Sequence, residues 1–269
     1  MGRATKRGRG IVTGTMRVAE HGAVRRPGDL RLLWLIALRG ARESLRDRLT
    51  IVVNLVFALG LPIVLLLTVV RLQIAVSGPD DAALGSSLAL FLFLLGLAPT
   101  TGAVGIACGQ FAGEAESGSL APLLASPASN VAIFGGKILA AVLPTLLFAA
   151  IADLTYLIGL AVGYGPERVR LLPPALALTL LLLVPATALF SATIASLVSS
   201  RVRTFNTAQQ ISGLVLTPLT GLLVAAVFVA QRAGAFGLGG VVVALVALDA
   251  LLIVVGAATW RREEVLARR

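Results

Sequence analysis

Six apolar stretches of roughly 20 residues each dominate the chain, and each is long enough to cross about 30 Å of hydrocarbon as a helix. They cover residues 50–70, 84–108, 138–160, 173–198, 211–230 and 240–259. Only 13% of all residues are charged, whereas a soluble domain carries about 25%. Because backbone hydrogen bonds must be satisfied inside the bilayer, these stretches predict an all-α integral membrane protein with six transmembrane helices.

Lysine and arginine are distributed unevenly among the segments between the apolar stretches. Of the 23 basic residues, 19 lie in the two terminal segments and in alternate loops, and 4 lie in the remaining loops. Cytoplasmic segments carry such an excess, so we expect both termini to be cytoplasmic. The bias also accounts for the net charge of +10, which therefore does not indicate nucleic-acid binding. The preference for arginine over lysine favours a bacterial protein, located in the cytoplasmic membrane.

The chain divides into four parts by composition. Residues 1–28 are rich in Gly and Arg and lack an apolar run, which predicts a disordered leader. Residues 29–49 place Leu30, Trp34 and Leu38 on one face and basic residues mostly elsewhere, which predicts an amphipathic helix in the cytoplasmic membrane interface. Residues 50–259 form the six-span domain, and residues 260–269 form a cytoplasmic tail.

A polar interruption at residues 111–137 separates the second and third stretches. Glu114 and Glu116 come first, and the sequence from Ser117 to Ser119, which includes Gly118, should break the helix. Ser119 can then cap a short helix over 120–126, which Pro127 ends. At about 10 Å this helix is too short to cross a bilayer, so it should lie along the membrane surface. Its apolar residues Leu120, Leu123 and Leu124 favour a protein partner.

This interruption resembles the loop after the second span in permeases of the ABC type-2, export-type transporter family. The family pattern is approximately E-x-E-x-G-T-L-x-x-L-L-x-x-P, followed by a helix that opens with G-K. The matching residues are Glu114, Glu116, Gly118, Ser119 in place of the usual Thr, Leu120, Leu123, Leu124, Pro127, Gly136 and Lys137. The resemblance implies that residues 120–126 form a coupling helix that docks on a separate ATPase subunit. It also implies pairing with a second copy of this chain or a related permease.

Small residues recur along the second stretch. Gly102, Gly105, Gly109 and Gly113 lie three or four residues apart, which lets another helix approach closely. The partner helix belongs either to the same chain or to a second subunit, and we favour the same chain.

Three polar side chains within the predicted spans, Asp249, Asp153 and Asn54, are candidates for a transport pathway. Asp249 falls near the bilayer midplane, where an ionised carboxylate costs roughly 2.5–3.5 kcal/mol. We expect it to be protonated, to hydrogen-bond to a hydroxyl or to Asn54, or to face a water-filled pathway. Asp153, toward the outer side of the third span, should reach interfacial water or Arg168.

Several kinds of chemistry lack the residues they need. Around Gly136 and Lys137 there is no phosphate-binding loop, because position 131 is Val and position 138 is Ile. The chain has one histidine, His21, and one cysteine, Cys108, so it offers no HExxH or CxxC motif. We therefore predict no catalytic residue, metal site or cofactor.

The favoured hypothesis is the membrane subunit of a bacterial ABC exporter, with an unknown substrate and a partner that hydrolyses ATP. A second hypothesis is a secondary transporter that uses Asp249 or Asp153 for proton coupling. A membrane-embedded enzyme is a third hypothesis, and a structural or regulatory membrane subunit is a fourth.

Overall fold

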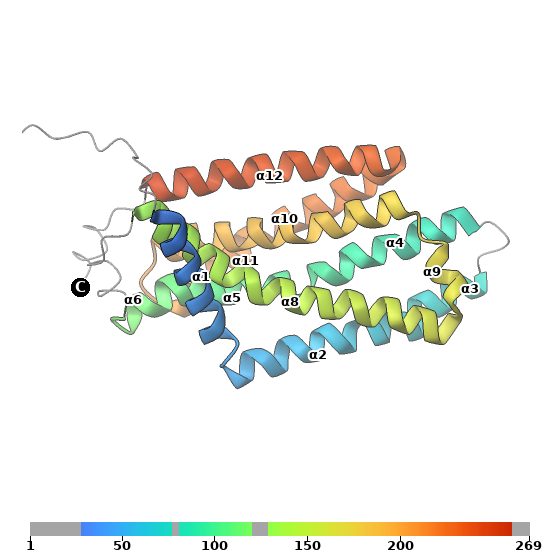
Figure 1. Ribbon diagram of the computed structural model, residues 1–269, viewed down its shortest axis with the longest axis horizontal. Coiled ribbons are helices and arrows are strands. Elements are labelled where there is room, and N and C mark those ends of the chain that lie inside the picture. Colours follow the sequence, from blue (N-terminus) through green and yellow to red (C-terminus); the bar gives the residue numbers. More distant parts are fainter. Residues whose placement is uncertain (1–27, 77–80, 120–128, 260–269) are drawn as a thin grey trace, which may run out of the picture.

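The computed structural model describes residues 28–76, 81–119 and 129–259, in which every regular element is a helix. Most of the helices run nearly side by side in one elongated bundle (Figure 1). Two π-helical turns, η1 (Leu66–Val70) and η2 (Gly109–Gly113), and one 3-10 turn, η3 (Gln231–Ala233), join neighbouring helices. The α-helices are α1 (Asp29–Ser44), α2 (Arg48–Leu65), α3 (Arg71–Val76), α4 (Asp81–Leu97), α5 (Thr100–Cys108), α6 (Glu114–Glu116), α8 (Asn130–Tyr164), α9 (Pro166–Arg170), α10 (Pro174–Ser199), α11 (Phe205–Ala230) and α12 (Gly234–Thr259).

Five helical segments are long and apolar enough to cross a membrane: Arg48–Val76, Ala83–Glu116, Asn130–Tyr164, Pro174–Ser199 and Phe205–Thr259. The last of these contains two helices, α11 and α12, which run in opposite directions (Figure 1). The reversal occurs at Gly234, whose φ of +67° is a conformation that favours glycine. An all-helical membrane protein is thus confirmed.

The helices differ in how much of their apolar surface lies inside the chain. In α8 and α10, 56% of the most apolar window is buried, so these two helices form the centre of the bundle. The corresponding share is 17% in the segment that begins with α2 and 22% in the segment of α11 and α12. These outer helices therefore present large apolar faces to lipid or to another subunit.

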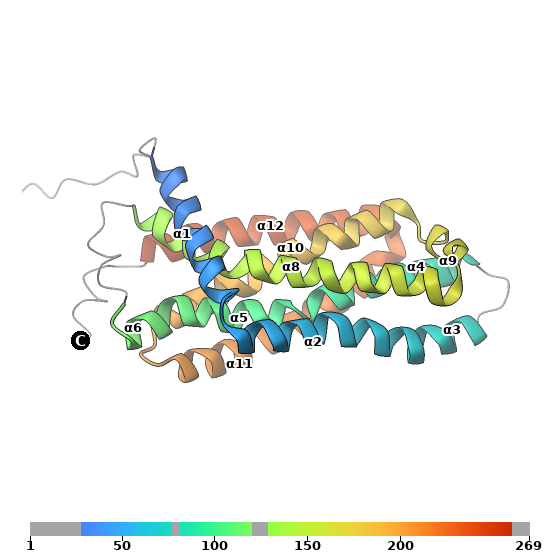
Figure 2. The ribbon, with the colours of Figure 1, turned by 60° about the horizontal axis from the view of Figure 1, so that its bottom comes forward.

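The first helix crosses the start of α8 at a steep angle (Figure 2). Glycines allow the two backbones to approach: a Cβ on Gly136 would lie 2.9 Å from the Leu33 carbonyl oxygen, and one on Gly40 would lie 2.7 Å from the Ala140 Cβ. The predicted apolar face of α1 does not pack against α8, since Leu30 is 78% and Trp34 50% exposed. The interior face of α1 is the adjacent one, with Ala37, Gly40 and Ala41 buried. This leaves the Leu30 and Trp34 face available for a membrane interface.

The predicted helix over 29–49 is wrong at its C-terminal end. It stops at Ser44, and α2 begins at Arg48 after a short turn. The cause is Asp47, whose carboxylate accepts hydrogen bonds from the backbone N–H groups of Leu49 at 3.3 Å and Thr50 at 3.2 Å. An aspartate in this position caps a new helix and so ends the old one. The predicted parts 1–28, apart from residue 28, and 260–269 lie outside the described residues.

Candidate functional site

The second membrane segment ends in a turn that we call the glutamate turn, Glu114 to Ser119. Its helix stops at Glu116, and Gly118 adopts a positive φ of 74°. The Ser117 hydroxyl donates to the Glu114 carbonyl oxygen at 3.2 Å and so satisfies one of the last acceptors of the helix. The predicted break is therefore present. The predicted coupling helix, with Leu120, Leu123, Leu124 and Pro127, lies outside the described residues.

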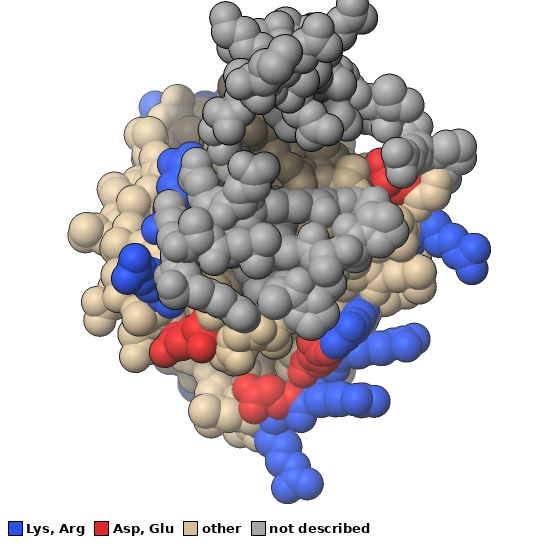
Figure 3. Space-filling view, turned by 90° about the vertical axis from the view of Figure 1, so that its left-hand side faces the viewer, with Lys and Arg blue, Asp and Glu red and all other residues tan. Residues whose placement is uncertain are grey.

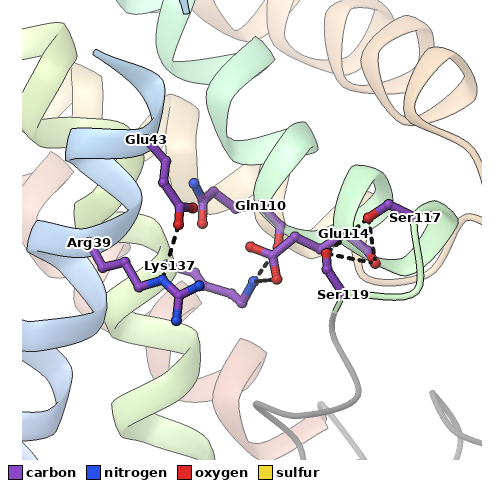
Figure 4. A network of polar contacts seen from close by, with 7 residues as sticks. All are labelled: Arg39, Glu43, Gln110, Glu114, Ser117, Ser119 and Lys137. Carbon is purple, nitrogen blue, oxygen red and sulfur yellow. Dashed lines mark hydrogen bonds and ion pairs between the residues drawn. The ribbon is translucent and has the colours of Figure 1, made fainter. Parts of the chain in front are cut away.

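Glu114 points into the protein and forms an ion pair with Lys137, two turns into α8 (Figure 4). The Lys137 Nζ lies 2.6 Å from the Glu114 Oε2, and the two side chains are 1% and 26% exposed. Lys137 also donates to the backbone oxygen of Gln110, and its Nζ lies 5.2 Å from the ring centroid of Phe111. A buried ammonium requires such partners, because they offset the free-energy cost of removing its charge from water. The ion pair fastens the glutamate turn to α8.

The π-helical turn η2, which contains Gln110, also contacts α1. A Cβ on Gly40 would lie 3.0 Å from both amide atoms of the Gln110 side chain, so that side chain packs directly on α1. In Figure 4, Gln110 lies between Lys137 and the α1 residue Glu43, which accepts a hydrogen bond from Arg39 Nε at 3.0 Å. Elements α1, η2 and α8 therefore meet around Gln110 and Lys137.

Glu116 makes a contact with a third membrane helix. Its Oε2 accepts a hydrogen bond from the backbone N–H of Phe205, the first residue of α11, at 3.0 Å. A carboxylate at a helix N-terminus is also favoured by the helix dipole, by about 0.3–1 kcal/mol. Two glutamates of one short turn are thus bound to two different helices, α8 and α11. Sequence reasoning missed these partners, although a single lysine in an apolar segment near a glutamate was a signal for the first.

A cleft of about 620 Å³ lies beside this network, between α2, α5 and the start of α11. We call it the α2–α5–α11 cleft. It reaches from Glu43 and Asp47, at the end of the bundle where α1 lies, to Phe57 about one-third of the way along the α2 segment. Asn54 and Gln209 line it from opposite helices. Charged side chains project around the rim of this end of the molecule (Figure 3).

Gly102, Gly105 and Gly109 of the second segment line this cleft, and all four predicted glycines face side chains of the same chain. A Cβ on Gly102 would lie 2.6 Å from Asn54 Oδ1, and one on Gly105 would lie 3.8 Å from Gln209 Nε2. Those on Gly109 and Gly113 would each lie 3.9 Å from the ring of Phe205. The expectation that these glycines pack against helices of the same chain is confirmed.

The predicted intramembrane residues are not brought together. Asn54 donates to the Thr50 carbonyl oxygen at 2.8 Å, whereas both oxygens of Asp249 are buried without a hydrogen-bond partner in the described ranges. Of the three alternatives for Asp249, the hydrogen bond to Asn54 or to a hydroxyl is therefore absent among the described residues. The helices that carry Asp249 and Asn54, α12 and α2, lie on different sides of the bundle (Figure 1). Asp153 is only 6% exposed, and its Oδ1 lacks a hydrogen-bond partner among these residues. That Asp153 reaches interfacial water or Arg168 stays a prediction.

Metal-binding side chains do not cluster in the part of the chain that the structure describes. The arrangement instead links a surface turn mechanically to α8 and α11. Comparison with known proteins is in accord with this description: a family model described as ABC-2 type transporter matches residues 31–231, which is most of the chain. No curated protein matches the sequence.

Proposed function

The chain belongs to the ABC-2 type transporter family, and we propose that it is the permease subunit of an exporter whose ATP is hydrolysed by a separate subunit. A membrane-spanning transport role follows from the family. The sequence has no phosphate-binding loop of its own, which supports a separate ATPase. Members of this family typically act together with such a subunit.

The observation that carries the proposal is the double attachment of the glutamate turn. The segment 120–126, which directly follows the turn, docks on the ATPase in our proposal. Glu114 is bound to Lys137 of α8, and Glu116 is bound to the first residue of α11. Closure of the ATPase on ATP would therefore move the starts of α8 and α11 together. A permease needs only such different contacts in two states, and no chemistry of its own.

We further propose six spans with both termini on the cytoplasmic side of a bacterial inner membrane. The excess of basic residues in the predicted cytoplasmic segments supports this orientation. The opposite directions of α11 and α12 support counting them as two spans. α1 would lie in the interface, with Trp34 toward the lipid and Gly40 against α8.

Two copies, or this chain and a related permease, would enclose the transport pathway. The exposed apolar faces of α2 and α11 flank the α2–α5–α11 cleft, which supports these helices as the surfaces that meet. Proton-coupled transport has less support. Asp249 is fully buried and does not line the cleft.

Co-purification with the ATPase encoded nearest to this chain tests the proposal. The native chain should form a complex with ATPase activity. The double variant Leu124→Arg with Glu116→Arg should lose the complex, because it places a charge on the proposed docking segment and removes the acceptor that holds the adjoining turn to Phe205. Glu167→Arg makes the same change as Glu116→Arg, but on α9 at the opposite end of the bundle, and it should retain the complex. A native chain that purifies without any ATPase would overturn the proposal.

A further inference from the structure

We infer that the α2–α5–α11 cleft binds amphiphilic organic cations and that these are the substrate class of the protein. The inference rests on the permease function proposed above, and it adds what the pathway accepts. Three observations carry it: the size of the cleft, the sign of the charge among its lining residues and the combination of polar and apolar side chains in its walls.

The cleft has the size of a small-molecule site. Its volume of about 620 Å³ lies within the range of roughly 300–1,000 Å³ found for ligand pockets. Asp47 and Phe57, at its two ends, are ten residues apart on α2, or about 15 Å at the rise of an α-helix. The cleft therefore accommodates a molecule of drug size, longer than a single ion or sugar.

Charge in the cleft has one sign. Glu43 and Asp47 are the ionisable side chains among its described lining residues, which include no lysine or arginine. The Thr50 hydroxyl and backbone N–H donate to Asp47 and hold the pKa of its carboxyl below the usual value of 3.8, so it is ionised at neutral pH. A phosphate or carboxylate ligand finds no cationic partner in this lining, whereas an organic cation finds an acidic end.

Arginines do lie near the acidic end, on the same stretch of chain. Arg39 pairs with Glu43, but the side chain of Arg39 is 82% exposed, and such surface pairs are weak. Arg42, Arg46 and Arg48 are also exposed, and none of them lines the cleft. Glu43 and Asp47 are exposed as well, so they differ from these arginines by lining the cleft and not by weaker screening.

Polar and apolar side chains both line the walls of the cleft. Thr50 and Asn54 follow Asp47 along α2, and Phe57 follows them. Ile106 and Phe205 line the cleft from the other helices. An amphiphilic cation would place its charge near Asp47 and its apolar part against these apolar side chains.

Two probes of the same shape and opposite charge test the inference. The full-length protein in nonionic detergent is dialysed to equilibrium against tetraphenylphosphonium or tetraphenylborate. Specific binding is the difference from Gly105→Leu, a variant that adds a large side chain to the lining of the cleft. Tetraphenylphosphonium should bind saturably and more weakly as salt rises, and tetraphenylborate should show no specific binding.

Charge variants provide the decisive comparison. Glu43→Gln with Asp47→Asn removes both charges while Asn retains the helix cap, and it should weaken tetraphenylphosphonium binding about tenfold. Glu167→Gln, which removes one charge at the opposite end, should bind as the native chain does. Specific binding of tetraphenylborate, or unchanged binding of tetraphenylphosphonium by the double variant, would overturn the inference. Either result leaves the permease proposal intact if the complex with the ATPase still forms.

Discussion

Replacing Glu114 by glutamine should lower the melting temperature of the detergent-solubilised protein by about 6–20 °C. The substitution leaves the Lys137 ammonium, which is 1% exposed, without its carboxylate partner. Removing one member of a buried ion pair costs about 3–5 kcal/mol, and each kcal/mol corresponds to roughly 2–4 °C in a protein of this size. Thermal unfolding followed by intrinsic fluorescence measures the shift.

Two further variants separate this effect from a general loss of charge. Glu116→Gln changes an exposed glutamate of the same turn and keeps an acceptor for Phe205, so it should melt within about 2 °C of the native chain. Glu114→Gln with Lys137→Met removes both charges and should be more stable than Glu114→Gln alone. If Glu114→Gln melts like the native protein, the buried ion pair is not formed.

Gly40→Leu should displace α1 from α8 and destabilise the protein by about 2 kcal/mol, or roughly 4–8 °C. The Cβ of the new leucine would lie 2.7 Å from the Ala140 Cβ. Each of these atoms is bonded directly to the backbone of its helix, so a rotamer change cannot relieve the clash. Fluorescence of Trp34 on α1, measured in a Trp260→Phe background, should shift because its surroundings change.

The matched control is Gly60→Leu in α2. Gly60 is also helical, but a Cβ there would meet no atom within 4 Å. Leucine has a higher helix propensity than glycine, so this variant should be as stable as the native chain or more stable. Equal melting temperatures for Gly40→Leu and Gly60→Leu would contradict the close packing of α1 on α8.

Membrane helices were predictable from the sequence because hydropathy depends only on local composition. The predicted span 50–70 lies within the observed segment Arg48–Val76. The predicted span 173–198 overlaps the observed helix Pro174–Ser199 over nearly its whole length. The break at Gly118 was predictable for the same reason, since it needs only turn residues after an apolar run. The end of α1 was missed because one aspartate, Asp47, caps a new helix inside an otherwise helical pattern.

The partners in the site were not predictable, because they depend on how the helices are rotated and placed. Glu114 was predicted only as the start of a polar loop, yet it points inward to Lys137. Glu116 and Phe205 are 89 residues apart in sequence. Asp249 and Asn54 were candidates for a hydrogen bond on grounds of depth alone, but they lie on helices on different sides of the bundle. The position of a residue within an apolar stretch gives its depth in the membrane, but it does not identify the neighbouring side chain on another helix.

Glu116 is central to the account, because it would transmit movement of the docking segment to α11. A pair of spin labels at Val254→Cys on α12 and Asn206→Cys on α11 reports on this step, in a Cys108→Ser background and in complex with the ATPase. Both labelled positions are exposed. Pulsed electron paramagnetic resonance then gives the distance between the labels before and after ATP is trapped with vanadate.

We predict that trapping shifts this distance in the native chain and in Glu116→Gln, which keeps an acceptor for the Phe205 N–H. In Glu116→Ala the complex should form and the distance should stay at its value without ATP. The same ATP-dependent shift in Glu116→Ala would contradict the account.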